Sequence, residues 1–230
     1  MKYLNKDDIF DAEGSEDLTK TSEQLQARVD FYEKQLLTLE PESEDYIKCL
    51  LEIARLQVEQ YEGKKAWDNG FKAFDIAIKK HFWELATESC DVMFLSEGPD
   101  ALVALGHALW LGITFPIDPE LTVAMLQHLI DESPKESETR AVAASVALFI
   151  ATSRAGKDSD LVLFTNQMLA GVADSHSHIT DQGSFDVWRK AMELDNIDIL
   201  LSKLSGAINQ LIKENWWVNK DDIYKIIDNS

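Results

Sequence analysis

Apolar residues recur every three or four positions along most of the chain, which is the spacing of one face of an α-helix. The first clear stripe follows a capping-box pattern at Thr21–Gln24, and Pro41 ends it. Similar stripes, separated by Gly, Pro or capping residues, predict helices at about 43–62, 65–80, 82–96, 100–113, 119–132, 138–154, 158–173, 184–194, 196–214 and 219–228. No segment shows a convincing strand pattern. We therefore expect an all-α fold of antiparallel helical hairpins.

Two predicted helices, 100–113 and 138–154, are apolar nearly all the way round. Such helices lie in the centre of a fold, and the small residues of the second allow neighbouring backbones to approach closely. Ala144 and Ala147 should therefore tolerate no added bulk. Residues 1–20 are polar and predict a partly disordered segment with a short helix from Asn5, while residues 21–230 predict a single helical domain.

Tyr61, Gly70, Phe74 and Ala77 have the spacing of four signature positions of a helical repeat. Comparable places further along the chain hold Ala104, Ala108, Leu111 and Pro116. On these residues the region 43–155 resembles the tetratricopeptide family in degenerate form. It departs from that family where Ala108 replaces an aromatic residue and where the Trp-x-x-Leu-Gly signature is absent. The resemblance implies a right-handed array of hairpins with a protein-binding concave face; an irregular helical bundle is the alternative.

The charge balance restricts the partners. Forty-one Asp and Glu face 22 Lys and Arg, a formal net charge of −19. Such a surface repels nucleic acid and anionic lipid, so we expect neither as a partner. Between His81 and Thr139 there are eleven acidic residues and a single basic one, Lys135. This acidic stretch either attracts a basic partner or is a solvated rim.

Cysteine content and hydrophobic runs indicate the compartment. Cys49 and Cys90 both sit in apolar helical patterns, which predicts buried thiols and a reducing environment. The first 20 residues have no apolar core of a secretory signal. The longest apolar run, Ala101–Ile117, is interrupted by polar residues, Gly and Pro and is shorter than the roughly 20 residues of a membrane span. The sequence therefore predicts a cytoplasmic protein.

Residues with catalytic or metal-binding chemistry are few. His176, His178 and Asp181 form one cluster of possible metal ligands, but they fall in a predicted polar loop where exposed histidines are expected. His107 and His128 each stand alone among apolar residues, as hydrogen-bonded core histidines do. No nucleophile motif, phosphate loop or dinucleotide fingerprint occurs. We therefore predict no catalytic residue, cofactor or metal, and no enzyme.

Two aromatic segments are the candidate contact sites. One is the joint between helices that runs from Trp110 to Pro119, either a packed corner or a docking corner. The other is Trp216–Trp217, where one ring should seal the last helix and the other should anchor a partner. Together with acidic residues these give the candidate partner-binding set: Trp110, Phe115, Asp118, Glu120, Asp131, Glu132, Trp216 and Trp217.

These features predict a non-catalytic protein-binding module, such as an adaptor, an assembly factor or a chaperone-like accessory, with a basic protein or peptide as its partner. Two other classes remain open. One is an acidic inhibitor or immunity-type protein that blocks a basic site by charge mimicry. The other is an enzyme whose pocket is built from scattered residues.

Overall fold

The computed structural model describes Tyr3 and residues 15–228, with side chains for Tyr3 and for residues 21–228. Helices hold 78% of the described residues, and this part of the chain contains no strand, which confirms the all-α prediction. The eleven α-helices found there are α1 (Ser15–Leu36), α2 (Glu44–Glu59), α3 (Gly63–Lys80), α4 (Trp83–Leu95), α5 (Ala101–Thr114), α6 (Pro119–Glu132), α7 (Glu138–Ile150), α8 (Asp160–Ser177), α9 (Gln182–Ala191), α10 (Ile197–Ile212) and α11 (Lys220–Asp228). A π-helical turn, Ala151–Ala155, continues α7.

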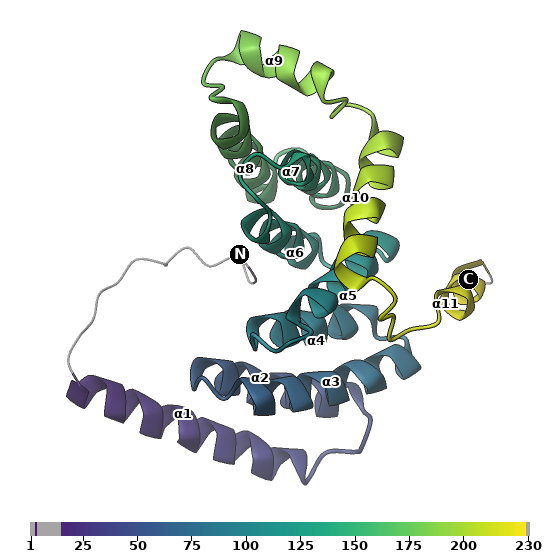
Figure 1. Ribbon diagram of the computed structural model, residues 1–230. Helices are drawn as coiled ribbons and strands as arrows, with labels where there is room; N and C mark the ends of the chain where they lie inside the picture. The colour runs from purple at the N-terminus through teal and green to yellow at the C-terminus, as the bar shows by residue number, and fades with distance from the viewer. Residues whose placement is uncertain (1–2, 4–14, 229–230) are drawn as a thin grey trace.

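The helices stack in chain order from α1 to α8, each packed on the one before it (Figure 1). Helix α10 then turns back and packs across both α5 and α7, so it joins the two halves of the stack. Helix α9 lies at one end of the molecule and α11 projects from its side. The arrangement is bundle-like, because a helix from the end of the chain closes over its middle.

Short polar side chains define where many helices begin. The side chains of Ser43, Asp118, Ser137 and Ser159 each accept a hydrogen bond from a backbone N–H two or three residues later. This satisfies one of the four N–H groups that a helix start leaves free. Pro119 follows its cap at the first helical position, where proline has no hydrogen bond to lose. The predicted helix 119–132 is therefore confirmed at both ends.

Other boundaries differ from the predictions. Helix α1 begins at Ser15, before the Thr21 capping pattern. Gly63 directly follows the predicted helix 43–62, where glycine is typical of a helix end, but it begins α3, and a turn at Tyr61 with φ of 58° ends α2 instead. A Cβ on Gly63 would lie 2.4 Å from the Ser96 carbonyl oxygen, so glycine at this position allows the start of α3 to approach the backbone of Ser96 closely. The predicted helix at Asn5 lies outside the described residues, as does most of the polar segment 1–20.

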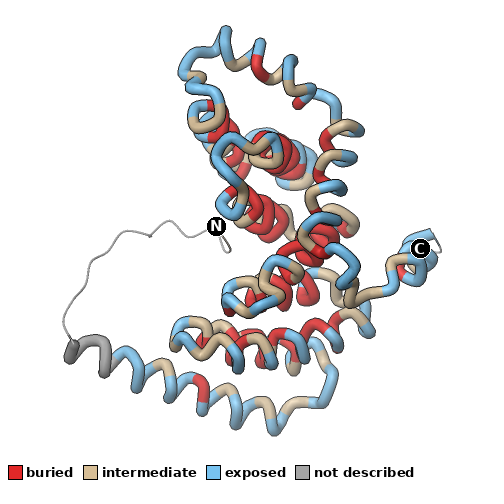
Figure 2. The backbone as a smooth tube through the Cα atoms, viewed as in Figure 1, coloured by how far each residue is buried: buried red, intermediate tan, exposed pale blue. Residues whose placement is uncertain are grey.

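The two apolar helices form the buried centre, as predicted. All seven residues from Ala141 to Ala147 in α7 are buried, and so is the run from Ala104 to Gly112 in α5 (Figure 2). Gly106 brings α10 against α5, because a Cβ at this position would lie 2.5 Å from Ile212 Cγ1. Cys49 and Cys90 are both buried and free of disulfide bonds. Burial raises the pKa of each thiol.

The residues that carry the repeat resemblance have different surroundings. Gly70 lies where α3 meets α4, with Met93 Cγ 2.9 Å from the position of a Cβ. Tyr61 lies in the turn between α2 and α3 and is 97% exposed. The resemblance to tetratricopeptide repeats stays a prediction. Among the described residues, no helix has the length and apolar character needed to cross a membrane.

Candidate functional site: an aromatic pocket beside the C-terminal helix

Two of the predicted residues, Trp110 and Trp216, meet on one side of the molecule. Their ring centroids are 5.7 Å apart and the rings are edge-on at 82°. Tyr224 of α11 completes the group, edge-on to Trp110 at 6.2 Å, and Trp110 Nε1 donates to its hydroxyl at 3.4 Å. A cavity of about 210 Å³ opens between these rings and one face of α10. We call this cavity the aromatic pocket. Its lining is Trp110, Ile113, Thr114, Leu201, Leu204, Ser205, Ile208, Asn209, Trp216, Lys220 and Tyr224.

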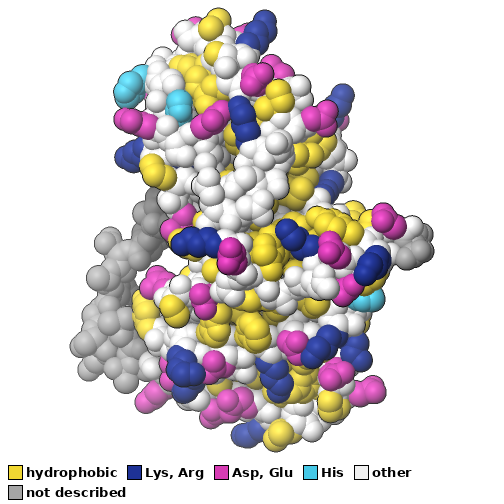
Figure 3. Space-filling view, turned by 45° about the vertical axis from the view of Figure 1, so that its right-hand side comes forward, with side chains coloured by type: hydrophobic (Ala, Val, Ile, Leu, Met, Phe, Trp, Pro, Cys, Tyr) yellow, Lys and Arg dark blue, Asp and Glu magenta, His cyan; other side chains and the backbone are white. Residues whose placement is uncertain are grey.

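A positive charge already sits on one wall of the aromatic pocket. The Lys220 ammonium lies 3.9 Å from the centroid of the Trp216 ring, which is cation–π distance. Lys220 forms no ion pair with any described residue. The neighbouring Asp222 carboxylate instead accepts from Lys225 and Asn219. The ring face of Trp216 therefore holds the charge of Lys220. Hydrophobic side chains gather on this side of the molecule at the level of α11 (Figure 3).

Trp217 belongs to a set of rings that we call the closed cluster: Trp67, Phe71, Phe74, His107 and Trp217. His107 of this cluster also lies edge-on to Trp216, with ring centroids 5.2 Å apart. Its ring stacks on His107 with centroids 4.4 Å apart and an interplanar angle of 7°. The Trp217 backbone N–H donates to His107 Nε2 at 3.1 Å, and His107 Nδ1–H donates to the Val103 carbonyl at 2.9 Å. His107 is fully buried, and burial lowers its pKa to about 4 although the Val103 hydrogen bond acts against this. The prediction of a hydrogen-bonded core histidine is confirmed here.

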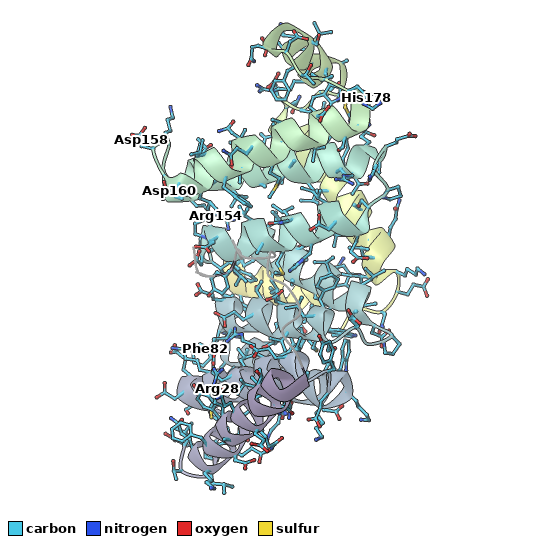
Figure 4. The ribbon with its side chains drawn as sticks, turned by 90° about the vertical axis from the view of Figure 1, so that its left-hand side faces the viewer. Arg28, Phe82, Arg154, Asp158, Asp160 and His178 are labelled. Carbon is cyan, nitrogen blue, oxygen red and sulfur yellow. The ribbon has the colours of Figure 1, made fainter. Side chains whose placement is uncertain are left out.

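The joint that contains Phe115 is a packed corner. Phe115 is buried and stacks on Trp83 with centroids 4.0 Å apart. Arg154, which lies in the π-helical turn (Figure 4), donates to the carbonyl oxygens of Gly112 and Ile113 at 2.8 and 3.3 Å and so caps the end of α5. Phe115 is a candidate contact residue by sequence, but its own side chain lies in the core.

Asp118 and Glu120 lie together at the start of α6, close to Glu88 of α4. Asp118 caps the helix, and Glu120 accepts from the Tyr3 backbone N–H at 2.7 Å. Glu88 is buried, paired with Arg55 at 2.5 Å, and accepts from the Tyr3 hydroxyl at 2.6 Å. Burial and the hydrogen bond to Glu88 raise the pKa of Tyr3. These carboxylates are thus engaged in structural contacts.

Asp131 and Glu132 lie at the other end of the same helix and are exposed. At a rise of 1.5 Å per residue, about 20 Å separates them from Asp118. The four acidic residues of the candidate set therefore do not lie together. Asp118 and Glu120 are engaged at the start of α6, while Asp131 and Glu132 are exposed at its end.

The histidine cluster differs from the sequence prediction. Residues 174–177 belong to α8 instead of a loop, and His178 is the left-handed residue that ends the helix (Figure 4). The ring centroids of His176 and Trp188 are 6.1 Å apart. His128, predicted as a core residue, is only partly buried, and its Nε2 lies 3.3 Å from Asp91 Oδ1. In the part of the chain that the structure describes, no three His, Cys, Asp or Glu side chains are grouped to hold a metal ion.

Sequence reasoning missed Lys220, Tyr224 and the contribution of α10 to the pocket. The available signal was the spacing of Ile223, Tyr224 and Ile227, which gives α11 an apolar side directly after two tryptophans. Nothing in the local pattern indicated that α10 returns to α5. Comparison with models of protein families, with curated proteins and with solved structures finds no match.

Proposed function

We propose that this protein is a non-catalytic, cytoplasmic protein-binding module, and that its aromatic pocket receives a Lys or Arg side chain of a basic partner. The observation that carries the proposal is the Lys220 ammonium 3.9 Å from the Trp216 ring centroid. A ring face that holds one cation binds another of similar chemistry, and aromatic anchors dominate many protein interfaces. An incoming side chain would take the place of Lys220.

The charge of the chain supports a basic partner. A net charge of −19 attracts positively charged proteins and raises their association rate. Asp131 and Glu132 are exposed and are suited to this long-range attraction. Asp118 and Glu120 are less suited, because their carboxylates already cap a helix and hold Tyr3.

The test begins with affinity capture from native lysate followed by mass spectrometry, with wild-type protein and Trp216→Leu as parallel baits. Binding kinetics of the recovered partner are then measured by surface plasmon resonance at several salt concentrations. We expect Trp216→Leu to weaken affinity at least about tenfold, mainly through faster dissociation. Phe31→Leu, which removes an exposed aromatic ring on α1, is the matched control and should leave affinity unchanged.

The same measurement separates the charge-mimicry alternative. If the protein is an acidic inhibitor of a basic site, the charge reversals Asp131→Lys and Glu132→Lys will lower affinity strongly while Trp216→Leu will have no effect. Under our proposal those reversals reduce the association rate and its salt dependence. A partner that binds all variants equally would contradict the proposed role of the pocket.

A further inference from the structure

A second cavity, built from other helices, lies between α6, α7 and α8. Its volume is about 270 Å³, and its apolar surface comes from Ile130, Phe164, Met168 and Val172. Arg140, at the start of α7, also lines it. We call this cavity the Arg140 groove. It shares no lining residue with the aromatic pocket, so it is a separate site.

Arg140 differs from the other partly buried arginines. Arg55 pairs with two glutamates, Arg154 donates to two carbonyl oxygens, and Arg189 pairs with Asp195. The Arg140 side chain makes no hydrogen bond or ion pair with any described residue, and its Nε is buried without an acceptor. A half-buried guanidinium without an acceptor lowers the stability of the fold. The chain has 41 carboxylates, but none of the described ones pairs with Arg140.

Nε is the one buried nitrogen of this guanidinium, so the two terminal nitrogens are the donors that a carboxylate from outside can reach. A guanidinium presents a planar pair of donors that matches a carboxylate, and the apolar wall beside Arg140 requires an apolar group close to that carboxylate. The C-terminal residue of a peptide carries both, because its carboxylate and its side chain are attached to the same Cα. An internal Asp or Glu lacks the apolar side chain. A volume of about 270 Å³ lies near the lower end of ligand pockets, which suits one residue.

The remaining polar residues of the groove fit a peptide. Gln127 and Gln167 each bring an amide that both donates and accepts, as a peptide group requires. Asp131 lines the same groove and forms no ion pair with a described residue. Its carboxylate is suited to a Lys or Arg upstream of the peptide terminus. We infer that the Arg140 groove binds the free C-terminal end of a protein chain whose last residue is apolar and is preceded by a basic residue.

The test uses the full-length protein and three fluorescein-labelled hexapeptides in fluorescence anisotropy. The first ends in Lys-Leu with a free carboxylate, the second is its C-terminal amide, and the third ends in Lys-Ser with a free carboxylate. We expect the first peptide to bind at least about tenfold more tightly than the other two. The amide loses the carboxylate contact with Arg140, and the Lys-Ser peptide loses the apolar contact with the groove wall. Equal binding of acid and amide, or no saturable binding at about 1 mM, would overturn the inference.

Two variants assign the binding to the groove. Arg140→Gln should remove the preference for the acid over the amide, while Arg28→Gln, on an exposed arginine of α1, should keep it. Gly171 lines the groove, and no atom lies within 4 Å of the position of a Cβ there, so Gly171→Leu adds an apolar side chain to the groove wall while Arg140 stays in place. This variant should abolish binding, whereas Gly206→Leu, equally uncrowded on α10, should not. Unchanged binding in both groove variants would place the peptide elsewhere and overturn the proposal.

A carboxylate from a small molecule is the competing source. Octanoate combines an acid with an apolar chain but offers no peptide group and no basic residue. If octanoate displaces the peptide with an affinity equal to that of the free-acid peptide, the groove is a small-acid site and the peptide assignment is wrong. The aromatic pocket is not involved in either outcome, and Trp216→Leu should therefore bind these peptides like the wild type.

Discussion

Trp216 and Trp217 are neighbours in the chain but belong to two different environments. Trp217 lies in the closed cluster, where its ring stacks on His107 and its backbone N–H has a fixed acceptor. Trp216 borders the aromatic pocket, where one ring face holds only the Lys220 ammonium. The first environment is complete within the protein, while the second has space and a replaceable charge. The comparison predicts that stability depends mainly on Trp217 and the proposed binding on Trp216, so that the two properties can be changed separately.

The largest expected effect is on the closed cluster. Trp217→Ala removes ring contacts with Trp67, Phe71, Phe74 and His107 and should lower the free energy of unfolding by about 3 kcal/mol. Trp216→Ala should cost about 1 kcal/mol, because its ring borders a cavity. Urea unfolding followed by circular dichroism measures both. Equal losses for the two variants would show that the environments do not differ as described.

The closed cluster should also respond to pH. The pKa of His107 is about 4 in the folded protein and about 6.5 in an unfolded chain. The unfolded chain therefore takes up the proton first, and the stabilisation is complete above about pH 6.5 and is lost as the pH falls toward 4. Protonation would also turn the Nε2 acceptor of the Trp217 N–H into a donor.

Between pH 7 and pH 5 this amounts to about 2 kcal/mol. Urea unfolding at a series of pH values should show the loss in the wild type and a flatter profile in His107→Gln. His178→Gln, at the exposed end of α8, is the control and should keep the wild-type slope. Parallel profiles for all three proteins would show that another group causes the pH dependence.

A substitution at Gly106 tests the contact between α5 and α10, because the absence of a side chain there lets the two helices approach. Both environments depend on this contact. In Gly106→Ala the new Cβ meets the buried Ile212 at 2.5 Å, and we expect a loss of about 1–2 kcal/mol. Gly206→Ala, in α10 with no atom within 4 Å, should instead stabilise by about 0.5–1 kcal/mol through helix propensity. Thermal unfolding of the two variants checks the expected loss in Gly106→Ala and the expected gain in Gly206→Ala. A Gly106→Ala protein as stable as the wild type would mean that α10 is not packed tightly on α5.

The smallest expected effect on stability is that of Lys220→Ala. A partly exposed cation–π contact contributes about 0.5–1 kcal/mol, so the melting temperature should fall only slightly. Affinity for the basic partner should rise in this variant, since the pocket no longer holds an internal cation. Weaker binding of Lys220→Ala would show that Lys220 itself contacts the partner.

Much of the fold could be predicted from local pattern. The sequence 118–132 combines a capping Asp, a proline at the first helical position and a regular apolar stripe, and its helix is confirmed at both ends. Gly63 misled the prediction because glycine both ends helices and permits close approaches, and only the position of Ser96 decides between these roles.

The candidate site could be predicted only in part. Trp110 and Trp216 were named from their residue type, but their meeting depends on α10 returning across α5, which local spacing does not encode. Phe115 has the same aromatic character as Trp110, and its stacking on Trp83 became visible only in three dimensions. Charge counting likewise gave the total for the acidic stretch but not its division between the two ends of α6.

The return of α10 also has a consequence for cooperativity. In an array where each unit touches only its neighbours, units at the ends can unfold independently of the middle. Here one late helix contacts both α5 and α7, so the middle of the molecule cannot open until the C-terminal part of the chain has been released. Amide hydrogen exchange in α5, α7 and α10 should therefore report a single opening free energy, while α1, whose main packing partner is α2, exchanges earlier.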